Sequence, residues 1–441
     1  MSQDRVVGST NPGGGVELPP GVELTTLDNG VRIVTEAMPS VRSVSLGIWV
    51  RTGSRDESAG QEGVSHFLEH LLFKGTPNYS ATDISEVFDG LGAAVNASTS
   101  KEVTNLYARF LDEHTDRAVA VLAEMFLQPT FPEIDSERQV VLEEIAMYED
   151  EPSDRVHDVL SAAMFGSHPL GKRVLGAAEV IAAIPVPEIA AYHQDRYRGS
   201  NLVVAAAGSL DHDKIVELTE KCLLASAEPL ASRPNGAAAT TSASLCFYPK
   251  DTEQYHLCIG APGLARDDDR RYVLSVLDSI FGGSTSSRLF REVREKRGLA
   301  YAVGSYNEGY ADCGISAVYV GTRADNVTEA CRVIGEEMAL IRDEGVTAAE
   351  LERAKESVKG RMVLGLESTS ARMVRVARPI LLDLELPPID ETLARIDAVS
   401  LSDVAALSAE LFAPERLSAA CIGPDESHFR AALGPVSETL G

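Results

Sequence analysis

The sequence predicts an α+β protein made of two homologous domains, each an antiparallel sheet packed with helices. Predicted strands are mixed with pairs of helices rather than alternating strictly with single helices, which favours antiparallel sheets. A chain of 441 residues is long enough for two or three domains. Three segments of the second half also echo the first: HLCIGAP resembles SLGIWV, LAYAVGSY aligns with LGAAVNAS at an offset of 208, and RLSAACIG aligns with NLVVAAAG at an offset of 215. Their common order indicates a duplication.

The first half opens with strand signals. A predicted hairpin over 24–36 has Asn29-Gly30 at its turn, between two runs of alternating polar and apolar residues. The run SVSLGIWV (43–50) predicts a further strand, and Ser65 predicts the cap of a helix over 66–74. The other predicted elements are a helix from Ser80 to Gly90 with Asp83 in its capping box, a strand pair over 93–110, helices over 112–127, 137–150 and 153–165, a strand over 201–208 and a helix over 211–224.

Two segments without periodicity set the predicted domain boundaries. Residues 1–22 are polar and rich in glycine and proline, so we expect a flexible N-terminal tail. Residues 225–244 are rich in alanine, serine and proline, which is typical of an inter-domain linker. The predicted domains are therefore 23–224 and its homologous second copy, 245–441.

The composition excludes several classes of protein. The 40 basic and 66 acidic residues give a formal net charge of −26, which disfavours a nucleic-acid partner. All six cysteines lie in the second half and none forms a Cys-x-x-Cys motif, so we expect reduced thiols rather than a disulfide framework. No apolar run is long enough to predict a membrane span. Because the N-terminus lacks the composition of a transit peptide, we expect a bacterial, cytoplasmic protein.

The motif His66-Phe-Leu-Glu69-His70 is the strongest functional signal. On a helix, residues four apart share a face, so both imidazoles can bind one metal ion. Glu69 lies beside them, where its carboxylate can take a proton from water on the metal. The surrounding residues are apolar on nearly every side, and three titratable groups on a buried helix need a partner such as a metal. The alternative is a chance spacing of two histidines.

A third ligand of a catalytic zinc site is predicted on a later helix. Ser136 and Gln139 form a potential capping box at the start of that helix. Glu137 and Glu144 lie on one stripe that is otherwise apolar, which is unusual for a core helix and suits a metal site. We therefore predict Glu144 as a ligand and Glu137 as a residue that supports the ligands. The alternative is two solvated glutamates on an exposed helix.

The segments GVSHFLEHLLFKGT and ERQVVLEEIAMYEDEP resemble the pitrilysin/insulinase family of metallopeptidases, whose inverted zinc motif is H-x-x-E-H. The resemblance runs from about residue 24 to 425 and is closest to the two-domain branch with the β subunit of mitochondrial processing peptidase and its bacterial relatives. It implies that His66, His70 and Glu144 bind one zinc ion per chain. It also implies that Glu69 is the catalytic base and that Glu137 supports the site.

Two further segments match this family. GAAVNASTSKEVTNLYARF resembles its sheet-edge segment, which implies that Asn96 and Ala97 contact a substrate added as an extra strand. Arg294 and Tyr301 resemble a pair that stabilises the tetrahedral intermediate. The residues alone leave alternatives open: Asn96 as a turn residue, Arg294 at the surface and Tyr301 in the core. The second copy has VLSVLDSIF in place of HFLEHLLF, so we expect the zinc site once.

The predicted function is that of a zinc-dependent endopeptidase hydrolysing extended peptides, with Glu69 as the general base. The resemblance implies two domains that face each other about a central cavity. It also implies a homodimer, or a heterodimer with a related subunit, and neither nucleic acid nor membrane is expected as a partner. The alternative is a non-catalytic peptide-binding or structural subunit of a processing-peptidase-like complex. A zinc hydrolase acting on another substrate is less favoured, because an edge strand suits an extended backbone.

Overall fold

The computed structural model describes residues 18–132, 134–223, 239–437 and 440. The predicted tail up to residue 17, and the predicted linker as far as residue 238, lie outside these described residues. Within the described part of the chain, no helix combines the length and apolar character that crossing a bilayer requires.

The first sheet has six strands in the order β1-β2-β6-β3-β5-β4. Its members are β1 (Val22–Thr26), β2 (Arg32–Ala37), β3 (Ser43–Val50), β4 (Ala94–Thr99), β5 (Thr104–Leu111) and β6 (Leu202–Gly208). The predicted hairpin, the strand at 43–50 and the strand pair are all present. The pairs are antiparallel except for β2 with β6, which is parallel, so the prediction of a purely antiparallel sheet was wrong at this pair. A long helical connection separates β2 from β6, and such crossovers permit parallel pairing.

Within the described part of the chain, the second sheet repeats this topology without an equivalent of β1. Its strands are β7 (Leu245–Pro249), β8 (Gln254–Gly263), β9 (Ala300–Gly309), β10 (Gly314–Arg323) and β11 (Ser418–Gly423). Their order is β7-β11-β8-β10-β9, and β7 with β11 is again the one parallel pair among these strands. The strands β4 and β9, and β6 and β11, occupy equivalent places, which agrees with the sequence echoes. The prediction of two homologous α+β copies is confirmed.

The helices of the first half are α1 (Val64–Leu71), α2 (Ala81–Gly90), α3 (Thr115–Leu127), α4 (Ile134–Glu149), α5 (Pro152–Phe165), α6 (Ala178–Ala183), α7 (Val186–Arg196) and α8 (His212–Leu223). Those of the second half are α9 (Arg271–Phe281), α10 (Val327–Glu344), α11 (Ala348–Gly365), α12 (Thr369–Leu381), α13 (Ile389–Asp397), α14 (Leu401–Leu411) and α15 (Glu426–Leu433). The predicted capping box of α2 is present, since Ser80 accepts from Asp83 N–H and Asp83 accepts from Ser80 N–H.

Two predicted helix starts were wrong. The helix α1 begins at Val64 with Gly63 as its N-cap, two residues before the predicted start at residue 66, because a carboxylate from an earlier loop replaces the expected Ser65 cap. The helix α4 begins at Ile134, so Ser136 lies inside its first turn rather than before it. Boundary residues are the least determined part of a helix by local sequence alone.

Contacts divide the chain into two compact units, and neither unit is one continuous stretch. The first unit combines the chain up to Leu142 with 174–234 and 364–391, and the second combines 143–173, 235–363 and 392–441. The predicted domains, 23–224 and 245–441, are continuous by comparison. Each unit therefore takes a segment from the other half of the sequence: α12 packs in the first unit and α5 in the second.

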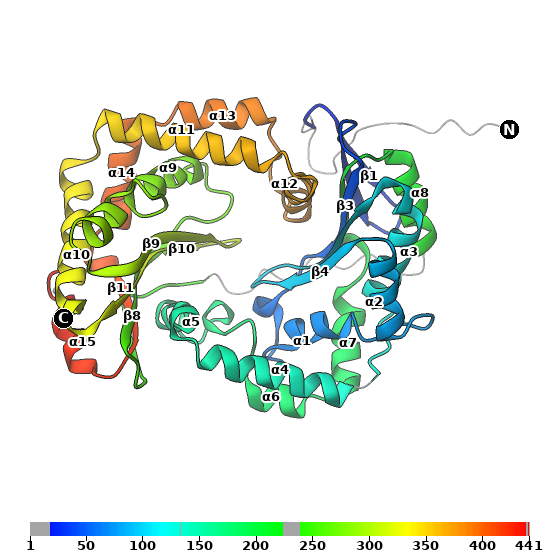
Figure 1. Cartoon of the computed structure of the whole chain (residues 1–441), viewed down its shortest axis with the longest axis horizontal. Helices are drawn as coiled ribbons and strands as arrows, with labels where there is room; N and C mark the ends of the chain where they lie inside the picture. Colours follow the sequence, from blue (N-terminus) through cyan, green and yellow to red (C-terminus); the bar gives the residue numbers. More distant parts are fainter. Residues whose placement is uncertain (1–17, 133, 224–238, 438–439, 441) are drawn as a thin grey trace. The chain divides into compact units, whose positions relative to one another are not determined.

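In the first unit, α3 and α8 lie against one face of the sheet and α12 covers the other (Figure 1). Apolar side chains of α12, including Met373 and Val376, pack against Trp49 and Val203 of the sheet in one core cluster. Polar contacts add to this docking: Ser45 Oγ is 2.9 Å from the hydroxyls of both Thr369 and Ser370, and Arg372 pairs with the buried Glu36. The sheet is thus buried on both faces, which explains its nearly continuous apolar strands.

In the second unit, α5 covers one face of the sheet, while α9, α10, α14 and α15 build the core with the other face (Figure 1). The α5 face contains the buried Leu160 and Met164, packed against Cys258 and Ala420 of the strands. Each sheet therefore uses helices of its own half on one face and a helix of the other half on the opposite face.

Replacing Met373 with alanine should destabilise the first unit by about 2–5 kcal/mol, because the deletion leaves a cavity between α12 and the sheet. Trp49 is the single tryptophan of the chain and belongs to the same cluster, so its fluorescence during urea unfolding reports on this unit. Leu364→Ala is the matched control, since that side chain is exposed and its loss should cost less than about 0.5 kcal/mol. Equal effects in both variants would contradict the docking of α12.

Candidate metal centre

The helix α1 buries His66 among apolar side chains and leaves His70 half-buried. Phe67, Leu68 and Leu71 are fully buried around the motif, and only 8% of His66 is exposed. The imidazoles of His66 and His70 meet edge to face, with ring centroids 4.7 Å apart. The four-residue spacing places the two rings side by side, as predicted.

The helix α4 supplies the carboxylates. Val141 is fully buried between Glu137 and Glu144 along the stripe, Glu144 is half-buried, and its neighbour Glu143 is exposed. Ligand atoms of His66, His70 and Glu144 all lie within 4.8 Å of one another, and this is the only such group of three among the described residues. Zinc ligands stand about 2.0–2.2 Å from the ion, so small side-chain adjustments suffice to close this set around one ion.

Glu137 orients the second histidine. Its Oε1 is 2.9 Å from His70 Nδ1, and its Oε2 is 2.6 Å from Lys74 Nζ. A carboxylate oxygen at this distance accepts the Nδ1 proton of His70 and leaves Nε2 as the atom for a metal. Two nitrogens and one oxygen with such a carboxylate–histidine pair are the donor set of a catalytic zinc site, so these residues fit zinc. Lys74, which follows the motif in the sequence, was not predicted.

Glu69 is half-buried on α1, and the charge of its carboxylate acts on the buried Tyr197. Burial raises the pKa of Tyr197 well above its ordinary value, with smaller contributions from Tyr192 and from the charge of Glu69. The tyrosine hydroxyl therefore stays protonated beside the predicted base.

A second buried carboxylate, Glu57, was also missed by sequence reasoning. Its oxygens accept the backbone N–H groups of Gly63 (2.8 Å) and Ser65 (2.9 Å) at the start of α1. Burial raises the pKa of Glu57 to about 7, although these two bonds act in the opposite direction. The glycine N-cap of α1 was the one available signal, because a cap without a side chain needs an acceptor from elsewhere.

The predicted substrate residues lie on an edge strand. The strand β4 is the last of its sheet, Asn96 is exposed and Ala97 is buried. Asn96 Oδ1 accepts the N–H of Ala97 at 2.9 Å, so the side chain covers one amide of its own strand. The strand lies beside α1, where the hydroxyl of Thr99 is 3.5 Å from the carbonyl oxygen of Ser65. The structure thus brings the predicted edge segment next to the histidine helix.

Arg294 and Tyr301 form a pair in the second unit. The Arg294 guanidinium lies 4.3 Å from the centre of the Tyr301 ring and donates from Nη1 to the Tyr301 carbonyl at 3.1 Å. Tyr301 is 80% exposed, so the alternative of a core tyrosine was wrong. A π-helical turn (Phe290–Glu295) carries the arginine, and β9 carries the tyrosine.

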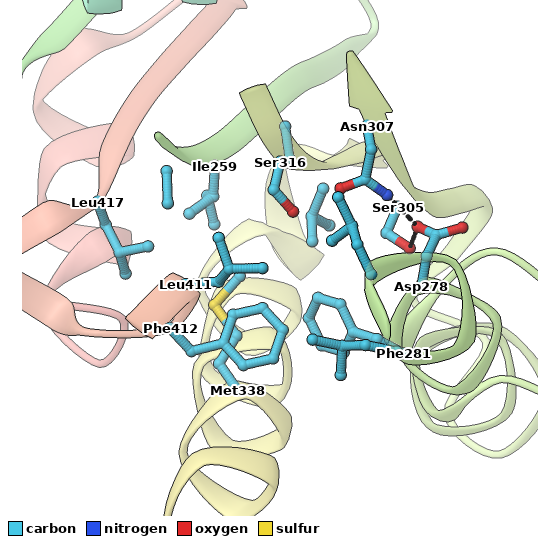
Figure 2. A pocket seen from close by; sticks show the side chains of 15 residues that line it. Ile259, Asp278, Phe281, Ser305, Asn307, Ser316, Met338, Leu411, Phe412 and Leu417 are labelled. Carbon is cyan, nitrogen blue, oxygen red and sulfur yellow. Dashed lines mark hydrogen bonds between the residues drawn. The ribbon is translucent and has the colours of Figure 1, made fainter. Parts of the chain in front are cut away.

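The second copy of the histidine helix is α9, and it has no equivalent metal group among the described residues. At the offset of 208, Asp278 takes the place of His70, and leucines replace His66 and Glu69. Figure 2 shows Asp278 accepting from Ser305 Oγ (2.6 Å) and Asn307 Nδ2 (3.0 Å) at the side of a mainly apolar pocket. The aspartate thus ties α9 to β9.

Comparison with known proteins identifies the family. The model described as "Insulinase (Peptidase family M16)" matches residues 32–178, and the one described as "Peptidase M16 inactive domain" matches residues 183–358. The chain belongs to peptidase family M16. The resemblance found in the sequence is thereby confirmed, and the second M16 model coincides largely with the copy that lacks the histidines.

Bacterial M16 relatives cover nearly the whole chain. An uncharacterized zinc protease of Streptomyces coelicolor is 43% identical over 91% of this chain and 90% of its own length. The uncharacterized zinc protease YmxG of Bacillus subtilis is 43% identical over 90% of this chain and 97% of its own length. An uncharacterized zinc protease of Mycobacterium tuberculosis is 40% identical over 91% of this chain and 93% of its own length.

Solved M16 structures share the fold. A protease from Helicobacter pylori superposes with a TM-score of 0.86 at 24% identity, covering 92% of this chain and 100% of the other. A protein from Pseudomonas fluorescens, described as a peptidase M16 inactive domain, superposes with a TM-score of 0.84 at 22% identity. The superposition covers 92% of this chain and 98% of the other. At these identities the likeness concerns the α+β architecture alone.

The raised pKa of Glu57 predicts a specific pH dependence of stability. Between pH 4.5 and 7 the folded carboxyl is protonated while the unfolded one is not, so stability should fall as pH rises through this window. Glu57→Gln should lack this pH-dependent loss of unfolding free energy. At about 1.4 kcal/mol per pKa unit, the loss in the wild-type protein amounts to as much as about 3 kcal/mol. Urea unfolding followed by Trp49 fluorescence at pH 5 and 8 measures it. Identical pH dependence in both proteins would contradict the raised pKa.

Proposed function

We propose that this M16 protein is a zinc-dependent endopeptidase that hydrolyses extended peptides. The observation that carries the proposal is the convergence of His66, His70 and Glu144, with Glu137 orienting His70. The names of the relatives support zinc as the metal, because they are described as zinc proteases. The complete set of ligands and base favours a catalytic chain over a non-catalytic subunit.

Zinc held by these three residues would act as a Lewis acid and lower the pKa of a water molecule on the open position. The role of Glu69 follows from its place on α1, three residues from His66 on the same helix. Its carboxylate accepts the proton of the attacking water and returns it to the leaving amine.

The edge strand β4 supports the choice of an extended peptide as substrate. None of the described strands pairs with its outer side, so backbone groups there are available to pair with a peptide. Because Asn96 Oδ1 accepts the N–H of Ala97, binding requires the asparagine side chain to turn away and exchange this bond for one with the substrate.

Arg294 and Tyr301 complete the proposed machinery as donors to the oxyanion that develops during attack. Their own geometry supports this role, because the exposed Tyr301 hydroxyl and the stacked guanidinium are held close together. The processing-peptidase likeness further supports a dimer, of two copies or of this chain with a related subunit. The bacterial relatives support a bacterial setting, with the cytoplasm as the proposed compartment.

The roles of the two glutamates can be separated by conservative substitution. Purified protein should hold about one zinc per chain by elemental analysis. Glu69→Gln should keep this zinc and lose at least roughly a hundredfold in peptide turnover, because an amide cannot accept the proton. Glu144→Gln should instead weaken zinc affinity.

Glu143→Gln is the matched control for the ligand, since this neighbouring side chain is exposed. It should change neither zinc content nor turnover. Absence of stoichiometric zinc in the wild-type protein would contradict the metal site, and equal zinc loss in the Glu69 and Glu144 variants would show that Glu69 is a ligand.

Tyr301→Phe and Arg294→Ala should each lower kcat by roughly a hundredfold without releasing zinc, the usual effect of one missing oxyanion donor. Arg291→Ala is the control, because this exposed arginine of the same π-helical turn pairs with Glu292. Steady-state kinetics on a fluorogenic peptide measures kcat, and elemental analysis of the same samples measures the zinc content. Unchanged kcat in both variants would remove the pair from the mechanism.

A further inference from the structure

We propose that Glu57 is a positioning residue for the metal-binding helix: its carboxylate clamps the first turn of α1 and so holds His66 in place before any metal binds. This inference rests on the proposed zinc site and extends it to a residue that contacts the backbone of the helix carrying two of the three proposed ligands. The carboxylate of Glu57 accepts hydrogen bonds from the backbone N–H groups of Gly63 and Ser65.

The helix α1 cannot cap itself. It has only eight residues, and its N-cap is Gly63, which has no side chain to accept the first N–H groups. A larger residue is excluded there: φ is +96°, and a Cβ would lie 2.7 Å from the carbonyl oxygen of Leu175 and 2.9 Å from the Cα of Gly176. The acceptor must therefore come from another segment, and Glu57 provides it.

Glu57 connects the end of β3 to the first turn of α1. It directly follows a short 3₁₀ turn (Ser54–Asp56) after β3, and only 5% of the residue is exposed. That turn is itself anchored, because Gly53 N–H donates to Asp56 Oδ2 and Arg196 donates to the Asp56 carbonyl at 3.1 Å. The carboxylate thus connects α1 to a fixed point of the first unit.

A second contact holds the same turn from the side of α7. The hydroxyl of Tyr192 lies 2.8 Å from Ser65 Oγ and 3.1 Å from Thr52 Oγ1, and all three residues are buried. Ser65 is therefore held through its backbone by Glu57 and through its side chain by Tyr192. His66 is the next residue, so the clamp ends directly before the first ligand.

The physical consequence is preorganisation of the metal site. An isolated eight-residue helix is not stable by itself, and its first turn is the part most prone to fray. Without the clamp, zinc would have to order this turn on binding, which would lower the affinity. With it, the imidazole of His66 is already directed when the ion arrives.

The test compares Glu57→Ala and Glu57→Gln with Glu62→Gln. Glu62 is the control because it is a nearby glutamate whose side chain accepts from Gly60 N–H in the same loop. Zinc affinity is measured by competition with a chromophoric chelator, and hydrogen exchange of 64–71 is measured in the metal-free protein. We expect Glu57→Ala to bind zinc at least roughly tenfold more weakly and to exchange faster over 64–71, with Glu57→Gln intermediate and Glu62→Gln unchanged.

The ligand-field absorption of the cobalt-substituted protein separates positioning from general stability, since it reports the geometry at the ligands. It should change in the Glu57 variants while Trp49 fluorescence shows an intact first unit. If Glu57→Ala does not fold, Tyr192→Phe removes the second contact alone and should shift zinc affinity and exchange in the same direction, by less.

Two failures remain distinguishable. If wild-type protein binds zinc and neither the Glu57 variants nor Tyr192→Phe changes affinity or exchange, the positioning role is overturned and the proposed function stands. If wild-type protein binds no zinc, the proposed function is overturned, and unchanged exchange over 64–71 in the metal-free variants would overturn the clamp as well.

Discussion

Two imidazoles can share one metal ion only if their helix is held at a fixed distance from the carboxylates that complete the set. This requirement governs much of the first unit. The helix α1 is packed among apolar side chains, so it cannot rotate to expose the histidines. Glu57 and Tyr192 hold its first turn, Glu137 and Lys74 hold the ring of His70, and the stripe of α4 aligns Glu144 with both rings.

The second copy of the fold shows how the same architecture is used where the histidines of α1 have no counterpart. The two sheets share one strand order, including the single parallel pair in each among the described strands. On α9, however, the histidines are replaced, and the remaining polar residue, Asp278, bonds to the edge strand β9 rather than to a metal. One copy keeps its edge strand beside the candidate metal-binding helix, and the other uses the same position for packing.

The exchange of helices makes the two halves of the sequence dependent on each other. The apolar face of the first sheet, which includes Trp49 and Val203, is covered by α12, and α12 lies more than 300 residues beyond β2 in the chain. A fragment ending near residue 235 would leave this face exposed to water. The pairing of Arg372 with Glu36 and the bonds of Ser45 fix the docking of α12 in a defined register.

The sequence by itself determined what short-range geometry controls: the strand runs, the Ser80 capping box, the face shared by His66 and His70, and the stripe with Glu137 and Glu144. These follow from residue spacing, because side chains three or four apart on a helix are neighbours wherever the helix lies. Only the tertiary structure decided the contacts of Glu57 with α1 and of Lys74 with Glu137, the cover of α12 and the parallel strand pairs. These join segments that spacing cannot relate, since their positions depend on how a sheet with two apolar faces is buried.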